Sequence, residues 1–176
     1  MDWAAVPAIP ANTPVYADAD QVIRRRGNVV LAVSMASPNA QSLKAMATAI
    51  EQLDSQVLVM VVIASAARAP DGPTRDAIRQ ITVRLQHRIA AFVYVVEGEG
   101  FAAAAIRSAI SFISMFARYS FPQRVMTTVE EGATWLVRQL PATGAHSHDA
   151  SRIVRTIEGM RAELRPREPE RRSDQA

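Results

Sequence analysis

Short apolar runs alternate with amphipathic segments along most of this chain. Residues 56–64 are apolar without alternation, a pattern typical of a central strand that is covered on both faces. A second run, over residues 92–96, is β-branched and aromatic; it breaks at residues 97–100 (EGEG) and continues as a helical pattern over residues 101–118. A strand that leads into a helix through a short glycine loop is a unit from which parallel α/β sheets are built.

The remaining segments continue this alternation of strands and helices. Two strand patterns that meet at Gly27-Asn28 indicate a hairpin, and apolar residues then recur at helical spacing in further segments. The resulting order, β-β-α-β-α-β-α-β-α, predicts an α/β fold with a mostly parallel mixed sheet and helical crossovers. The segments are the hairpin over residues 22–34, a helix from Ser37-Pro38 to Asp54, a helix that buries Ile78, Ile81, Leu85 and Ile89, a strand over 123–129 and a helix over 130–140.

Changes in composition near both ends delimit one domain. We expect residues 1–14 to form a flexible arm, residues 15–140 the α/β domain, and residues 141–148 a linker. Residues 149–164 predict a C-terminal amphipathic helix that docks either on its own domain or on another chain. The charged residues 165–176 are expected to be disordered. The apolar stripe of the C-terminal helix consists of Ile153, Ile157, Met160 and Leu164.

Three stretches carry a family resemblance: VVEGEGFAAA at 95–104, FPQRV at 121–125 and VEEGATWL at 129–136. Together with the order of elements over residues 15–140, they resemble a subgroup of STAS-like bacterial proteins, which have the fold of anti-sigma-factor antagonists. The resemblance implies a STAS-like domain that acts as a non-catalytic regulatory module, through protein interaction or ligand sensing.

One motif of the switched STAS antagonists is absent. Those proteins carry a phosphorylated Asp-Ser-Ser/Thr-Gly motif where the helix after the third strand begins, and residues 65–74 here do not match it. Thr74 is the nearest hydroxyl and is a possible regulatory phosphorylation site, because a helix N-terminus favours phosphate. The alternative is that Asp71 or Gly72 caps the helix and Thr74 only occupies its first turn.

The composition excludes several classes of chemistry. Hydrophobic residues make up 49% of the chain and charged residues 21%, as in globular domains. Because the chain has no cysteine, disulfides, thiolate catalysis and cysteine-based zinc sites are excluded. Lys44 is the only lysine and follows no glycine-rich loop, which argues against a Walker-type phosphate site. We expect no cofactor and no enzymatic activity.

The sequence also argues against binding to nucleic acid, to a metal ion or to a membrane. The net charge is only +3, and the arginines, such as those at 24–26, are not interleaved with aromatic residues, which indicates a solvated face. His146, His148 and Asp149 lack further ligands nearby. The longest apolar run, over 57–67, is too short to span a bilayer, and no secretory signal is evident, so we expect a cytoplasmic location.

The turn at residues 97–100 and the helix after it are the remaining candidate sites. The two glutamates of the turn would repel an anion, so a structural turn is favoured over a ligand or cation site. The helix over 101–118 is polar only along a narrow stripe, which indicates burial on more than one side. That apolar surface belongs to the core, or else forms a ligand pocket or an interface through Ile110, Phe112, Met115 and Phe116.

Two functions follow as hypotheses. The first is a regulatory or protein-interaction module that binds a protein partner or self-associates. The alternative is a binding protein for a small, lipid-like apolar molecule held under the helix over 101–118. The second hypothesis predicts a cavity beside that helix, and a solid core there would remove it.

Overall fold

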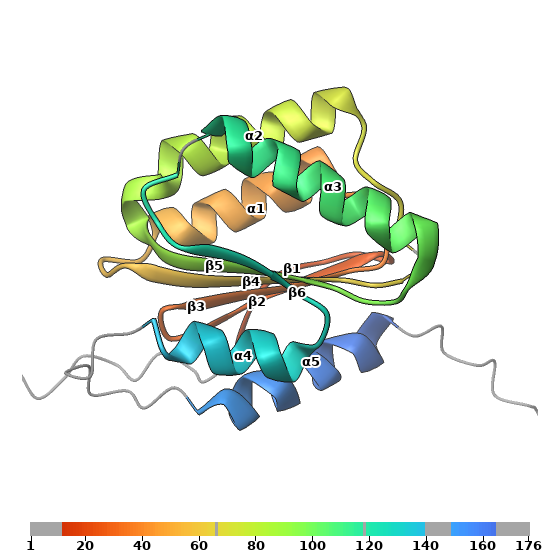
Figure 1. The fold of residues 1–176 in the computed structure, drawn as a ribbon. Helices are drawn as coiled ribbons and strands as arrows, with labels where there is room; N and C mark the ends of the chain where they lie inside the picture. The colour runs from red at the N-terminus through yellow and green to blue at the C-terminus, as the bar shows by residue number, and fades with distance from the viewer. Residues whose placement is uncertain (1–11, 66, 118, 140–148, 165–176) are drawn as a thin grey trace, which may run out of the picture.

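A computed structural model describes residues 12–65, 67–117, 119–139 and 149–164 of the chain (Figure 1). These residues form a six-stranded mixed sheet and five α-helices, which confirms the predicted α/β fold. A short 3₁₀ helix, Gln86–Arg88, links α2 to β5. The elements are β1 Thr13–Ala17, β2 Gln21–Arg26, β3 Val29–Ser34, α1 Ala40–Glu51, β4 Val57–Ile63, α2 Gly72–Leu85, β5 Ile89–Val96, α3 Gly100–Ala117, β6 Gln123–Met126, α4 Val129–Val137 and α5 Ala150–Leu164.

The strands lie in the sheet in the order in which they occur along the chain. β1, β2 and β3 pair antiparallel, and β3, β4, β5 and β6 pair parallel. Leu31, Met60 and Val93 lie side by side across the centre of the sheet. The parallel strands are joined by helical crossovers, as the alternation of strand and helix patterns predicts.

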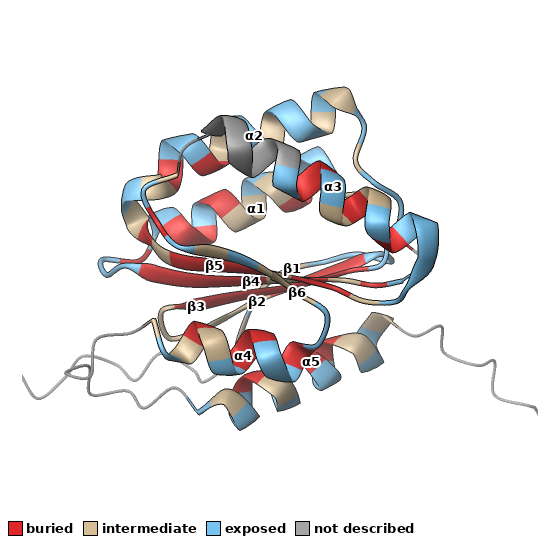
Figure 2. Cartoon of the chain, in the orientation of Figure 1, coloured by how far each residue is buried: buried red, intermediate tan, exposed pale blue. Residues whose placement is uncertain are grey.

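Helices cover both faces of the sheet. Figure 1 shows α1, α2 and α3 on one face and α4 and α5 on the other. Side chains alternate along each strand, so Val57 and Val59 of β4 pack in the α1 layer while Leu58 and Met60 pack against α4 and α5. Figure 2 shows buried residues concentrated in the strands and on the helix surfaces that face them.

The apolar stripe of α5 packs against the sheet of its own chain. Ile153, Ile157 and Met160 are buried in the core formed with β2 to β5 and α4, and Leu164 is partly buried at its edge. Arg24 of β2 donates to Glu163 of α5 at 2.6 Å. In this structure α5 therefore completes the second helical layer of the domain.

A strand precedes the predicted hairpin. β1 begins at Thr13 and includes Pro14, whereas the sequence pattern places both residues in a flexible arm. The strand lies at the sheet edge, and its register shifts between Pro14 and Tyr16. Proline has no N–H to donate to a ladder, so a strand that contains it is tolerated at such an edge. Residues 1–11 of the predicted arm, the predicted linker and the predicted tail lie outside the described residues.

Several element boundaries also differ from the predicted ones. The helix predicted from Ser37 to Asp54 spans Ala40–Glu51, because Asn39 and not Ser37 caps it. Ile89, predicted on the stripe of the second helix, begins β5. Val129, predicted at the end of a strand, begins α4 after a Thr128 cap. In the two capped cases a side chain hydrogen-bonds the first free N–H groups, which apolar periodicity alone does not reveal.

Candidate functional site

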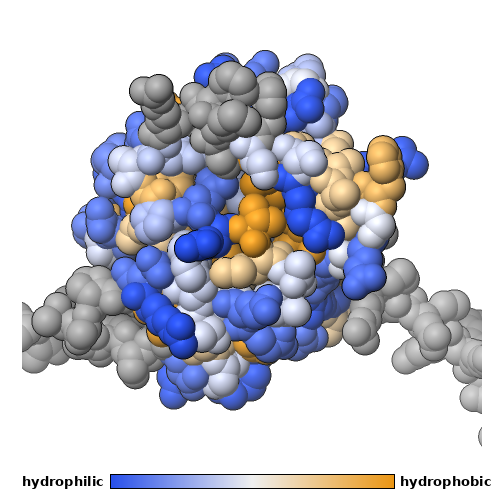
Figure 3. Space-filling view, viewed as in Figure 1, coloured by the Kyte–Doolittle hydropathy of each residue, from blue (hydrophilic) through white to orange (hydrophobic). Residues whose placement is uncertain are grey.

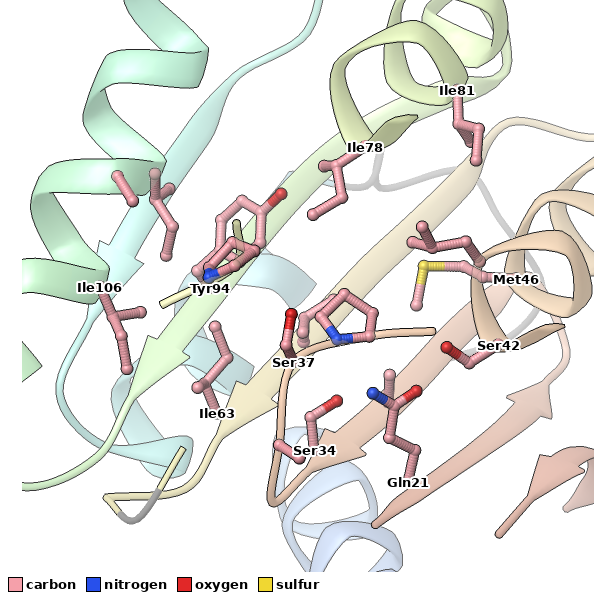
Figure 4. A pocket seen from close by; sticks show the side chains of 18 of the residues that line it. Gln21, Ser34, Ser37, Ser42, Met46, Ile63, Ile78, Ile81, Tyr94 and Ile106 are labelled. Carbon is pink, nitrogen blue, oxygen red and sulfur yellow. The ribbon is translucent and has the colours of Figure 1, made fainter. Parts of the chain in front are cut away.

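An apolar cavity of about 110 Å³ lies between the sheet and the helices α1, α2 and α3 (Figure 4). It is located where the parallel strands end, beside Ser34 of β3, Ile63 of β4 and Tyr94 of β5. In open α/β sheets, ligands commonly bind outside the carboxyl ends of the strands. The cavity therefore occupies the part of the fold where a ligand site is expected.

The exposure of β4 shows that the cavity is confined to one face and one end of the sheet. On the α1 side, Val57 and Val59 are fully buried, whereas Val61 and Ile63 are partly accessible. On the opposite face, Met60 and Val62 are fully buried. Side chains of a central strand are normally covered on both faces, so this change along β4 marks a hollow in the packing.

Helix α3 contributes part of the apolar wall opposite the sheet. Its buried residues at the cavity are Ile106, Ala109 and Ile110. Of the predicted pocket residues, the structure thus places Ile110 at the cavity. The side chains of Phe112, Met115 and Phe116 lie outside the described residues.

Other lining residues come from α1 and α2. Leu43 and Met46 of α1 and Ile78 and Ile81 of α2 are partly accessible and line the same cavity. Figure 4 shows Ile78, Ile81 and Met46 around one side of the space and Ile106 on the other. Helical spacing identifies these residues as inward-facing, but it carries no signal that they face a hollow rather than each other.

Apolar surface is visible from outside the molecule on the face shown in Figure 3. Hydrophobic residues lie in a hollow between the helices above and the sheet edge below, and hydrophilic residues surround it. The close-packed interior of a domain rarely leaves such apolar surface accessible in a depression.

Buried polar groups gather at one end of the cavity. Gln21 begins β2 and is paired in register with Ser34 at the end of β3, and both side chains are buried. Ser42 of α1 is buried beside them, and its Oγ accepts from the Asn39 N–H at 3.1 Å and donates to the Asn39 carbonyl at 3.0 Å. The Nε2 of Gln21 is buried and has no hydrogen-bond partner among the described residues. The cavity therefore has a polar end, and most of the rest of its lining is apolar.

Asp18 holds this polar end in place. Its carboxylate accepts from the N–H of Gln21 at 2.7 Å, from the Tyr16 hydroxyl at 2.6 Å and from the Asn39 side chain at 3.0 Å. Desolvation raises the pKa of Asp18, but these hydrogen bonds and one from the Asp20 N–H outweigh it and lower the pKa below its usual value. The charged carboxylate thus joins the start of β2 to the start of α1.

Tyr94 supplies a second polar group, at the side of the cavity between Ile78 and Ile106 (Figure 4). Its ring stacks on Phe92 with centroids 4.5 Å apart. Burial, reinforced by Tyr119, raises the pKa of Tyr94 far above its usual value. Its hydroxyl therefore stays protonated at physiological pH and acts as a hydrogen-bond donor or acceptor rather than as a base.

The turn over residues 97–100 serves packing between layers. Glu97 forms an ion pair with Arg161 of α5, and Arg107 of α3 donates to the Gly98 carbonyl at 3.2 Å. Gly98 has a φ of +81°, and a Cβ there would lie 2.6 Å from the Cβ of Ser65. These contacts support the structural interpretation of the turn. Within the described ranges, no three His, Cys, Asp or Glu side chains are grouped so that they could hold a metal.

Thr74 lies in the first turn of α2, next to the cap of that helix. Its N–H donates to the Asp71 carboxylate at 2.9 Å, and hydrogen bonds from the Thr74 hydroxyl and N–H lower the pKa of Asp71. Asp71 is thus the N-cap, as one of the two alternatives supposes. A phosphate on Thr74 would stand beside this carboxylate, which opposes it by charge repulsion.

Comparison with models of protein families, with curated proteins and with solved structures found no match to this chain. None of the helices in the described parts of the chain is both long enough and apolar enough to cross a membrane. His146 and His148, weighed above as metal ligands, lie outside the described residues.

Proposed function

We propose that this protein binds a small apolar ligand in the cavity beneath α1, α2 and α3, without catalysing its conversion. The observation that carries this proposal is the cavity itself, of about 110 Å³, in an otherwise close-packed core. A ligand in this hollow covers apolar side chains that are otherwise partly accessible, among them Met46, Val61 and Ile63. Such burial is favourable by about 25 cal/mol per Å² of apolar surface.

The volume limits the size of the ligand. An engineered apolar cavity of about 150 Å³ accommodates benzene. A cavity of about 110 Å³ suits a single small ring or a short branched alkyl group. The cavity encloses only a small part of a long-chain lipid, so we narrow the lipid-like ligand of the second hypothesis to a molecule that fits the enclosed space.

The chemistry of the lining supports binding rather than catalysis. Among the described lining residues, Arg68 and Tyr94 are the side chains that can carry a charge. Arginine remains protonated in proteins, and the raised pKa of Tyr94 keeps its hydroxyl neutral. Neither group serves as a general base near neutral pH, and these residues supply no pair that could exchange a proton with a substrate.

As a second function we propose a STAS-like regulatory module in the cytoplasm, with the ligand as its signal. The element order from β2 to α4, β-β-α-β-α-β-α-β-α, supports this proposal because it is the order on which the STAS resemblance rests. Light scattering with and without ligand tests whether binding changes self-association. A change of oligomeric state on ligand binding is the expected result, and an unchanged monomer that retains no partner from lysate contradicts it.

A pair of matched variants tests the cavity with toluene as the probe. Ala109 of α3 lines the cavity and is buried, whereas Ala104 of the same helix is exposed. Ala109→Leu fills the space, so we expect it to reduce toluene binding at least tenfold, while Ala104→Leu leaves it unchanged. Ligand-observed NMR and the toluene-induced rise in melting temperature measure this. Failure of the unmodified protein to bind toluene, or equal binding by both variants, overturns the proposal.

A further inference from the structure

The unpaired amide of Gln21 indicates the chemical class of the ligand. We propose that the cavity takes a small apolar molecule that carries one neutral carbonyl oxygen, and that the Gln21 side chain donates a hydrogen bond to this oxygen. This inference rests on the proposed function, because it assigns the polar contact of the same ligand.

Burial makes the unpaired donor informative. Gln21 is only 2% exposed, and its Nε2 has no partner among the described residues. Buried polar atoms are hydrogen-bonded in the great majority of cases, and an exception calls for an explanation. Figure 4 shows the Gln21 side chain directed from β2 into the region between Ser34, Ser37 and Ser42.

The buried hydroxyl of Ser42 is already engaged. The Oγ of Ser42 donates to the Asn39 carbonyl and accepts from the Asn39 N–H, so it is committed to the start of α1. The backbone of Gln21 is likewise occupied, since its N–H donates to Asp18 and its carbonyl accepts from the Asp18 N–H at 2.9 Å. The side-chain amide is thus a buried donor at this end that the described residues leave unpaired.

The apolar lining favours a neutral acceptor over a carboxylate. A carboxylate would lose its hydration on entering an apolar cavity, and burying an unpaired charge is costly. The charged groups nearby do not offset this loss, because Arg68 of the lining is exposed to solvent and Asp18 contacts the backbone N–H of Gln21 at 2.7 Å. A ketone or ester oxygen accepts the same hydrogen bond without this penalty.

The amide reaches the cavity by a small motion. The last side-chain torsion of glutamine is broad and roughly two-fold, so the amide group can turn without moving the strand. The apolar body of the ligand then lies against Ile23, Met46 and Val61, which line the same space. A molecule with one ring and one carbonyl oxygen satisfies both the volume and the polar end.

Two probes of nearly equal shape test this inference. Cyclohexanone and methylenecyclohexane differ in one group, C=O against C=CH₂, so the ratio of their affinities isolates the acceptor. We expect Gln21→Met, which keeps the length of the side chain but removes its donors, to lower the ketone-to-alkene affinity ratio about tenfold. Gln80→Met is the matched control, because Gln80 is exposed on α2, and it should leave the ratio unchanged.

The outcomes separate this inference from the proposed function. If methylenecyclohexane binds but Gln21→Met leaves the ratio unchanged, the carbonyl anchor is wrong and the apolar site stands. If neither probe nor toluene binds, both proposals fail. If Gln21→Met does not fold, the NMR signal of the Gln21 side-chain amide in the unmodified protein is measured instead. We expect this signal to shift when cyclohexanone is added but not when methylenecyclohexane is added. Equal shifts with the two probes overturn the proposed hydrogen bond.

Discussion

Among single residues, Asp18 has the largest set of contacts at the polar end of the cavity. Its carboxylate accepts hydrogen bonds from Tyr16, Asn39 and two backbone N–H groups, those of Asp20 and Gln21. All four donors favour the charged form, and together they lower the pKa of Asp18 in spite of the desolvation that raises it. The ionised form therefore stabilises the folded state more than the protonated form does.

This pKa shift predicts how stability depends on pH. An aspartate whose folded pKa lies below its unfolded value of about 3.9 contributes stability above that value, and the contribution is lost as pH falls through the folded pKa. We expect the free energy of unfolding to fall below about pH 4, and Asp18→Asn to flatten this dependence. Urea unfolding between pH 2 and pH 7 measures both. An equally steep acid dependence in the variant would show that other carboxylates are responsible.

At the level of elements, the start of α1 positions one wall of the cavity. Asn39 and Ser42 form a capping box in which each side chain accepts from the other residue's backbone N–H, at 2.9 Å and 3.1 Å. The Asn39 side chain also donates to Asp18, so the cap links α1 to the turn between β1 and β2. The cap thus fixes where α1 begins relative to Gln21.

A pair of substitutions distinguishes this cap from the one that the sequence suggests. Asn39→Ala removes the cap and should lower the free energy of unfolding by about 1 kcal/mol. Ser37→Ala should change it by less than about 0.5 kcal/mol, because Ser37 lies before the helix and does not cap it. Denaturant titration of both variants measures the difference. A larger loss for Ser37→Ala than for Asn39→Ala would place the start of the helix where the sequence suggests.

At the level of the whole molecule, the two helical layers are packed differently. The α4 and α5 layer forms a solid core with the sheet, in which Met60, Ile157 and Met160 are fully buried. The α1 to α3 layer contains the cavity. The α5 side is therefore closely packed, and the opposite side has room for a ligand.

The packing of α5 on its own domain gives a test at this scale. Met160→Ala should lower the free energy of unfolding by about 2–5 kcal/mol, because it leaves a cavity in the core. Met35→Ala is the matched control, since Met35 is 38% exposed, and it should have a much smaller effect. The comparison is made by denaturant unfolding at several protein concentrations. Equal losses, or a loss for Met160→Ala that depends on concentration, would indicate that α5 docks on another chain.

The sequence by itself determined the order of strands and helices from β2 onward and the mostly parallel sheet. These features follow from local periodicity: the unbroken apolar run of β4 and the three-to-four spacing along the helices depend only on residues near in the chain. The hairpin at Gly27-Asn28 is also a local property of its turn. The edge strand β1 escaped prediction because its proline is compatible with pairing only at the edge of an assembled sheet.

Only the tertiary structure decided that a cavity exists and where it lies. Its walls come from four strands, three helices and the loops before α1 and α2, and the lining residues of the strands and helices have the ordinary inward spacing of their own elements. Ile110 could be proposed from the sequence because α3 is apolar around most of its surface. Gln21 could not, because its burial and its unpaired amide arise from Ser34 of the next strand and Ser42 of α1 closing around it. Whether inward-facing side chains meet or leave a space depends on how far apart the packed elements lie, which periodicity along the chain does not encode.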